Sequence, residues 1–79
     1  MKKHFRTAQT HISNAIASLA LVQASLELAM GDTTITEQDR RLIMQLRQWV
    51  KESDNDARLV ERMIDDKLTT FRLQSEGGQ

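Results

Sequence analysis

The sequence predicts an all-α protein, a helical hairpin made of one long helix, a glycine turn and a second long helix. Two observations lead to this fold class. The 79 residues contain no proline, and Gly31 is the only glycine outside the C-terminal EGGQ. On both sides of Gly31, apolar residues recur at steps of three and four, as an α-helix requires. We expect a single helical domain over residues 1–73 and a disordered tail over residues 74–79.

The first helix is expected over about residues 4–30. Glu27 is the only charged residue between Thr7 and Met30. An apolar stripe runs along the whole segment, at Phe5, Ala8, Ile12, Ile16, Leu19, Val22, Leu26 and Met30. Alanines and leucines also occupy the other sides of its second half, and a helix that is apolar around most of its circumference is normally buried on several sides. We therefore expect more than one helix to pack against it.

Residues 31–35 are expected to form the turn. Gly31 is predicted to end the first helix in the left-handed conformation that glycine adopts most easily. Thr36 and Asp39 have the Thr-x-x-acid spacing that caps a helix start, which predicts a second helix from residue 36 to about residue 73. A DNA-reading helix-turn-helix is not expected, because the arginines after the turn are interleaved with acidic residues.

The second helix must pass through Ser53–Asp56 (SDND), four residues that disfavour helix interiors. Apolar positions keep one helical phase across this segment, at Leu42, Leu46, Trp49, Ser53, Ala57, Val60, Ile64, Leu68 and Phe71. A loop of arbitrary length would not preserve that phase, so the pattern favours one continuous helix, straight or bent at residues 53–56. The alternative is a third helix that starts near Asp54 and folds back, because SDND also has a capping spacing.

One hairpin is not expected to bury its own apolar surface. At 1.5 Å per residue, the first helix is about 40 Å long and the second about 55 Å, so part of the second helix lacks a neighbour. Chains of this size often gain stability by association. We expect a homodimer in which four helices form a bundle around the alanine-rich first helix. The residues predicted for the dimer core are Ile16, Leu19, Ala20, Leu26, Leu46 and Ile64.

Composition argues against catalysis and against a bound cofactor. Eleven basic residues balance eleven acidic ones, so strong non-specific binding to nucleic acid is not expected. The chain has no cysteine, no glycine-rich phosphate loop and no recognisable pair of nucleophile and base. His4 and His11 lack the further ligands that a metal site needs. We expect a non-enzymatic protein without a catalytic, metal or cofactor site.

The N-terminal segment resembles a targeting signal in one respect. MKKHFR is basic, and the apolar run Ala15–Ala24 ends in a passable signal-peptidase site. The polar run TAQTHISN separates the two, and cleavage would remove the helix against which the second one packs. We expect a cytoplasmic protein, and no membrane partner, because four polar residues interrupt the longest apolar region, namely Ser18, Gln23, Ser25 and Glu27.

A protein-binding site is the functional feature that the residues suggest. Trp49 lies on the apolar stripe of the second helix, where it either packs in the core or forms an exposed hot spot. The residues that follow Ser53 form either an acidic surface for a basic partner or a solvated bend. The predicted protein-binding residues are Trp49, Asp54, Asn55, Asp56 and Arg58.

Between Leu28 and Val60, the order of TEQD at Thr36, then Leu46, then WV-x-x-SDND from Trp49 resembles the Bdm/YmgB (AriR) group of small enterobacterial biofilm and acid-resistance regulators. The resemblance implies a small, helical, dimeric and non-enzymatic protein that modulates regulators of surface-lifestyle genes. In some members this is done as a connector to an Rcs-type phosphorelay, which implies a response regulator as the partner. The group offers no catalytic residues to carry over.

Two other functions stay open at this point. One is a Rop-like helical dimer that binds RNA, which requires the basic side chains of Lys2, Lys3, Arg6, Arg40, Arg41 and Arg47 to gather on one face. The other is a secretion chaperone or phage-encoded inhibitor that lends its apolar helix to a partner chain and becomes ordered only in that complex.

Overall fold

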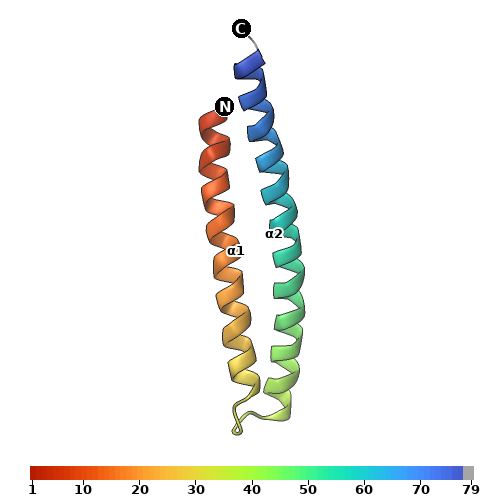
Figure 1. Ribbon diagram of the computed structural model, residues 1–79. Coiled ribbons are helices and arrows are strands. Elements are labelled where there is room, and N and C mark those ends of the chain that lie inside the picture. Colours follow the sequence, from red (N-terminus) through yellow and green to blue (C-terminus); the bar gives the residue numbers. More distant parts are fainter. Residues whose placement is uncertain (78–79) are drawn as a thin grey trace.

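The computed structural model describes residues 1–77 and consists of two antiparallel helices, α1 (Lys2–Met30) and α2 (Glu37–Gly77), as Figure 1 shows. The predicted all-α helical hairpin is confirmed. The hairpin is a rod of 65 × 15 × 15 Å, with the turn at one end and the start of α1 and the end of α2 towards the other. Its shape leaves no interior apart from the line along which the two helices touch.

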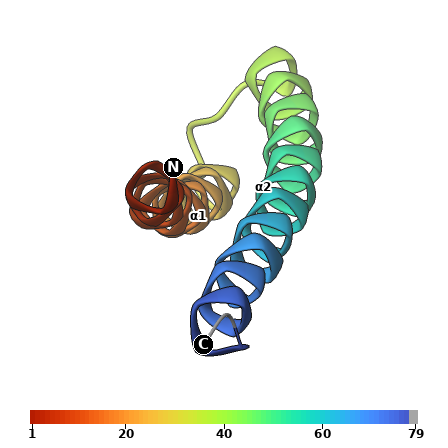
Figure 2. The same ribbon diagram turned by 90° about the horizontal axis from the view of Figure 1, so that it is seen from above.

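Helix α2 runs through Ser53–Asp56 without interruption, so the prediction of one continuous helix is confirmed and the alternative third helix is wrong. Figure 2 shows α2 as a gentle curve beside α1 with no break. Packing explains why these weak helix formers stay helical. Asp54 is half-buried and its carboxylate accepts a hydrogen bond of 2.9 Å from Arg58 Nε, and Ala57, one residue beyond the segment, is among the most buried side chains.

The C-terminal boundary differs from the prediction. Helix α2 extends to Gly77, whereas the sequence pattern predicted an end near residue 73 and a tail from residue 74. The apolar stripe stops at Leu73, but no proline or internal glycine follows before Gly77, so the backbone hydrogen bonds continue beyond the last packed residue. The rest of the predicted tail, residues 78–79, lies outside the described residues.

Gly31 ends α1 in a conformation other than the predicted one. Its φ and ψ are −83° and −5°, which is the right-handed region, so the prediction of a left-handed cap is wrong. The last turn tightens instead: Gly31 N donates to Leu28 O and Asp32 N to Ala29 O, each at 3.1 Å. These i→i−3 bonds satisfy carbonyl groups that a left-handed cap would otherwise satisfy. The conformation is therefore open to any L-amino acid.

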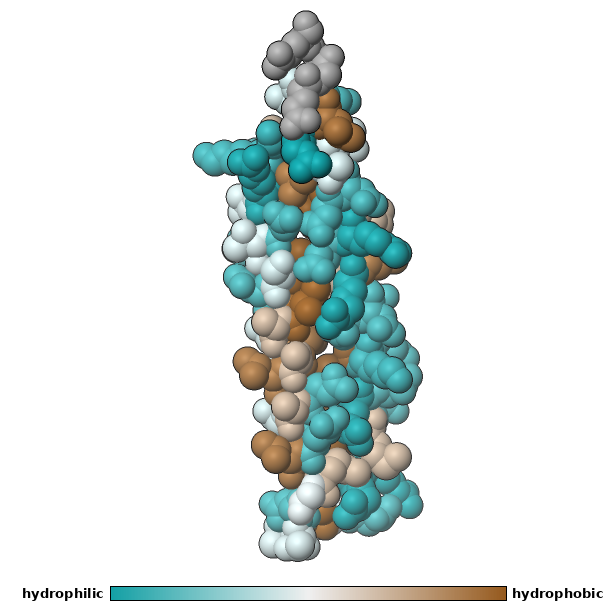
Figure 3. Space-filling view, viewed as in Figure 1, coloured by the Kyte–Doolittle hydropathy of each residue, from teal (hydrophilic) through white to brown (hydrophobic). Residues whose placement is uncertain are grey.

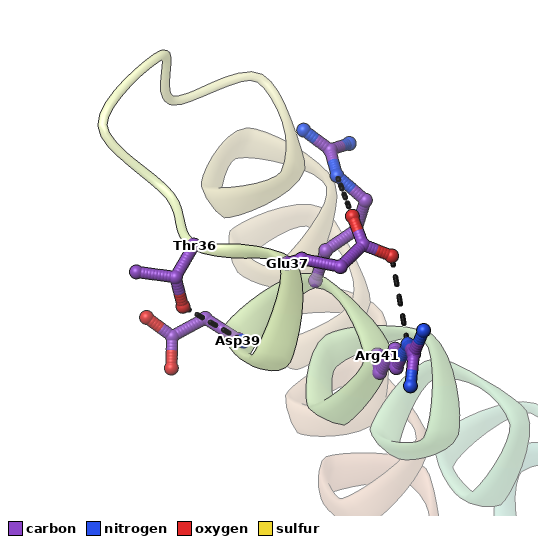
Figure 4. A network of polar contacts seen from close by, with 5 residues as sticks. Thr36, Glu37, Asp39 and Arg41 are labelled. Carbon is purple, nitrogen blue, oxygen red and sulfur yellow. Dashed lines mark hydrogen bonds and ion pairs between the residues drawn. The ribbon is translucent and has the colours of Figure 1, made fainter.

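Side chains organise the turn and the start of α2. Asp32 Oδ1 accepts hydrogen bonds from Thr34 N (2.9 Å) and Thr34 Oγ1 (2.7 Å), which together lower the pKa of the Asp32 carboxyl group. The predicted cap is confirmed, since Asp39 N donates to Thr36 Oγ1 at 3.1 Å (Figure 4). Glu37, in the first turn, pairs with Arg41 at 3.5 Å, on the positive end of the helix dipole where an acid is favourable.

Gly31→Ala is expected to raise the free energy of unfolding by about 0.4–1 kcal/mol, because alanine adopts this backbone conformation while restricting the unfolded chain. An added Cβ would lie 3.5 Å from Leu28 O, an ordinary contact. Urea unfolding followed by circular dichroism at constant protein concentration measures the change. As a reference, Thr36→Ala should lower stability by about 1 kcal/mol. A similar loss for Gly31→Ala would mean that the residue is left-handed after all.

Acid is expected to weaken the turn through Asp32. Because the folded state lowers this pKa, the stabilisation is present above the ordinary value of 3.8 and is lost as the pH falls through the lower folded value. Asp32→Asn keeps an accepting oxygen but does not titrate. The stability difference between the wild type and Asp32→Asn should therefore be constant near neutral pH and shrink below about pH 4. Thermal unfolding of both proteins across this range tests it, and a difference that grows in acid would contradict it.

Candidate protein-binding surface

The contact between α1 and α2 follows a seven-residue repeat, which is the spacing of a left-handed helix pair. We call this line of contact the seam. On α2 it contains Ile43, Val50, Ala57, Ile64 and Phe71, and on α1 it contains Phe5, Ile12, Leu19 and Leu26. Within the described residues only Ile43 (9 % exposed) and Ala57 (8 %) are buried, while the other members of the seam are half-buried. The hairpin core is therefore one side chain wide.

The open end of the hairpin is held by aromatic contacts. The rings of Phe5 and Phe71 meet edge to face, with centroids 5.8 Å apart, and Lys67 Nζ lies 4.9 Å from the centre of the Phe71 ring. Both geometries are favourable for aromatic rings. They join the first turns of α1 to the last part of α2.

One flank of the seam is polar and carries three bridges between the helices, so we call it the bridged flank. Gln9 Nε2 donates to Asp65 Oδ1 at 2.7 Å. Ser13 Oγ donates to Glu61 Oε2 at 3.2 Å. Arg47 Nη2 lies 3.7 Å from Glu27 Oε1. On α2 the residues four positions after the seam are polar at Arg47, Asp54 and Glu61, whereas the next one along is half-buried Leu68.

The opposite flank carries more apolar side chains and, among the described residues, no bridge between the helices, and we call it the apolar flank. In a seven-residue repeat, the residue four positions after a seam residue lies on one side of the seam. The residues three positions after and one position before a seam residue lie on the other side. On α2 the large apolar side chains at these positions are Leu42 (55 % exposed), Trp49 (54 %), Val60 (44 %), Met63 (63 %) and half-buried Leu46. The polar residues at these positions include Ser53, Asp56, Lys67 and Thr70. On α1 most of them are small, at Ala8, Ala15, Ser18, Ser25 and Ala29, and the larger ones are Val22, His4 and His11.

Two hollows show that the apolar sides of the two helices face the same way. Near the turn, Ala29 of α1 and Leu42 of α2 line a hollow of about 360 Å³. Near the open end, Phe5 of α1 with Val60 and Met63 of α2 line another of about 380 Å³. The apolar flank thus extends along the rod from one end to the other.

Figure 3 shows one face of the hairpin, on which hydrophilic side chains cover most of α2 and hydrophobic ones follow the line between the helices. Hydrophobic and small side chains also gather over the lower half of α1. Leu21 (70 % exposed) and Leu28 (79 %) belong to that half. This agrees with the prediction that α1 is apolar around most of its circumference.

The structure divides the five predicted protein-binding residues between the two flanks. Trp49 and Asp56 are one heptad apart on the apolar flank, where both are exposed. Asp54 is half-buried on the bridged flank and pairs with Arg58, whose pKa is raised by the Asp54 carboxylate. Asn55 joins Asp54 at a hollow of about 500 Å³ on that flank. One flat partner surface therefore does not meet all five residues.

The residues predicted for the dimer core lie mostly within the chain's own contact. Four of them are half-buried between α1 and α2, at Ile16, Leu19, Leu26 and Ile64, and half-buried Leu46 lies on the apolar flank. Ala20 is exposed on the side of α1 that bears the bridges. The apolar stripe predicted for α2 follows the 3.6-residue period of a straight helix. Its first residues therefore lie on the apolar flank and its last residues lie in the seam. The seven-residue spacing was the signal that separates the two.

The sequence predicts neither a metal site nor a membrane partner. Among the described residues no group of three or more His, Cys, Asp or Glu side chains is placed to hold a metal ion, and His4 and His11 are exposed. Helix α1 is nevertheless long and apolar enough to cross a membrane by length and composition, and none of that stretch is buried. Of the four polar residues in its apolar region only Glu27 is charged, so the absence of a membrane partner stays a prediction.

Reversing the charge of one bridge should loosen the hairpin, and reversing both partners should restore it. Glu27→Arg is expected to lower the free energy of unfolding by about 0.5 kcal/mol, since the pair is partly exposed. The double variant Glu27→Arg with Arg47→Glu should recover most of that loss. Urea unfolding of both variants is the measurement, and additive losses would show that the two residues do not interact.

No protein-family model, curated protein or solved structure matches this chain.

Proposed function

We propose that this protein is a non-enzymatic, cytoplasmic protein-binding module that works as a homodimer of helical hairpins. The observation that carries the proposal is the excess of uncovered apolar surface. Eleven large hydrophobic side chains are exposed in the described part of the chain, whereas two apolar side chains are buried. A protein that stayed alone in water would leave this surface unfavourably hydrated.

The surface area points the same way. The chain exposes 6209 Å², whereas a compact monomer of 9.1 kDa is expected to expose about 4,900 Å². The excess of about 1,300 Å² per chain exceeds the ~800 Å² that each partner of a standard interface covers. Other copies of the chain are present wherever the protein is, so a second copy is the first partner that we propose.

The two flanks support two separate roles. The apolar flank suits the contact between hairpins, where shape and apolar area decide affinity. The bridged flank stays outside that contact and presents the hollow at Asp54 and Asn55, together with Lys51 and Arg47. Its mixed charges suit a polar protein surface. In this proposal the partner is a regulatory protein, a response regulator in keeping with the resemblance to the small biofilm and acid-resistance regulators.

The RNA-binding alternative lacks the arrangement it requires. Lys2, Lys3 and Arg6 are at the start of α1, and Arg40 and Arg41 are beside the turn, at opposite ends of a rod 65 Å long (Figure 1). Both arginines beside the turn also lie near Glu37, at 3.9 and 3.5 Å. A chaperone or inhibitor that lends α1 to another chain would instead use the same exposed apolar surface, and it predicts an unstable isolated hairpin.

Oligomeric state is the first test. Light scattering at several concentrations should give about twice the mass of one chain, because each hairpin covers exposed apolar side chains of the other. A monomer at every concentration would refute the homodimer. A chain that unfolds when isolated and orders only with another protein would favour the chaperone or inhibitor.

Asp54→Lys is expected to reduce the capture of a protein partner from bacterial lysate by about tenfold or more, because it reverses a charge at the bridged-flank hollow. Tagged protein, nuclease treatment and mass spectrometry provide the readout. Asp66→Lys makes the same change on the outer side of α2 and should capture the partner normally. Helicity and dimer mass should be unchanged in both variants. Capture that survives Asp54→Lys, or that disappears on nuclease treatment, would contradict this role.

A further inference from the structure

The apolar flank has complementary sizes on its two helices. Three bridges define how the antiparallel helices are aligned, namely Gln9–Asp65, Ser13–Glu61 and Glu27–Arg47. All three fit one alignment, in which moving one residue forward along α1 corresponds to moving one residue back along α2. By this register, Ser25 is level with Trp49. Small and large side chains also share a level, within one residue, in three further pairs, namely Ala15 with Val60, Ala29 with Leu46, and Val22 with Ser53. At every one of these levels, one helix is large where the other is small.

We propose that a second copy of this chain docks on the apolar flank with both turns at the same end, related by a two-fold axis parallel to the helices. Such a rotation places α1 of each copy against α2 of the other at the same level. The large side chains of Trp49, Val60 and Leu46 then meet small residues of the partner's α1, and Met63 is level with His11. The inference rests on the proposed homodimer and specifies its geometry.

The opposite orientation fits the surface less well. Placing the turns at opposite ends sets α2 against α2 and α1 against α1 across the apolar flank. Large side chains such as Trp49 and Met63 would then meet large ones, whereas Ala15 and Ser18 would meet small ones. Packed helices lie about 8–10 Å apart, depending on the size of the side chains between them. The large side chains would therefore push the two α2 helices apart, and the small ones would leave a gap between the two α1 helices.

Three polar residues of the apolar flank, Ser18, Ser25 and Asp56, are compatible with being covered. Ser25 Oγ already donates to Leu21 O at 2.9 Å, so a tryptophan above it leaves no hydroxyl without a partner. Asp56 is level with Ser18 by the register of the bridges. In the same-end dimer the Ser18 hydroxyl of one copy faces the Asp56 carboxylate of the other and can donate to it.

Pulsed electron paramagnetic resonance tests the orientation. The natural chain has no cysteine, so Thr33→Cys in the turn carries a single nitroxide label. The same-end dimer should give a label-to-label distance of about 20–30 Å, since the helices are 8–10 Å apart and the labels are flexible. Opposite ends should give about 50 Å or more, the length of the helices. Lys3→Cys at the other end of the rod should behave as Thr33→Cys does.

A size exchange tests the contact independently. Ala15→Leu should weaken dimerisation about tenfold by overfilling the contact with the partner's Val60. Adding Val60→Ala should restore dimerisation to within about threefold of the wild type, because volume returns at the same level. Ala17→Leu, on the outer side of α1, should leave dimerisation unchanged. Sedimentation equilibrium provides the dissociation constants.

The outcomes separate the inference from the function on which it rests. A dimer with long label distances and no rescue by Val60→Ala would overturn the same-end geometry and leave the homodimer standing. A monomer in all variants would overturn both. A monomer that binds vesicles of phosphatidylcholine and phosphatidylglycerol would show that the apolar flank faces lipid instead of a second copy.

Discussion

The single line of contact between α1 and α2 is the constraint on which the rest of the structure depends. Two helices can enclose only the side chains that lie directly between them, and here those are few and mostly half-buried. All other apolar side chains of an apolar α1 and an amphipathic α2 are left on the outside. The exposed apolar flank is therefore a consequence of the topology, and the proposed homodimer would cover it.

Polar residues in the contact fix how the helices are aligned. A seam made only of aliphatic side chains would allow α1 and α2 to slide by a heptad with little change in buried area. Gln9, Ser13 and Glu27 meet their partners on α2 in one alignment only. Each bridge is exposed and contributes little stability. The bridges instead fix how α1 is aligned along α2. That alignment sets which small and large residues of the two helices lie side by side on the apolar flank.

Much of the fold follows from local patterns in the sequence. The absence of proline, the position of Gly31 and the Thr36 cap define two helices and a turn, and preserved phase carries α2 across SDND. The conformation of Gly31 was not predictable, because tightened and left-handed helix ends both suit glycine and differ only in which carbonyl groups are satisfied. The end of α2 was also missed, because helix propagation past the last packed residue leaves no mark in the apolar pattern.

The candidate site was harder to predict because it depends on which side of α2 faces α1. Residues 54, 55 and 56 are neighbours in sequence, yet successive residues of a helix are about 100° apart, so a compact sequence motif is spread around the axis. Contact with α1 then decides which of them is covered. Asp54 turns to the bridged flank and Asp56 to the apolar one. The same rotation that divides the motif places one short segment on both flanks, which the proposed function assigns to a second hairpin and to a different protein.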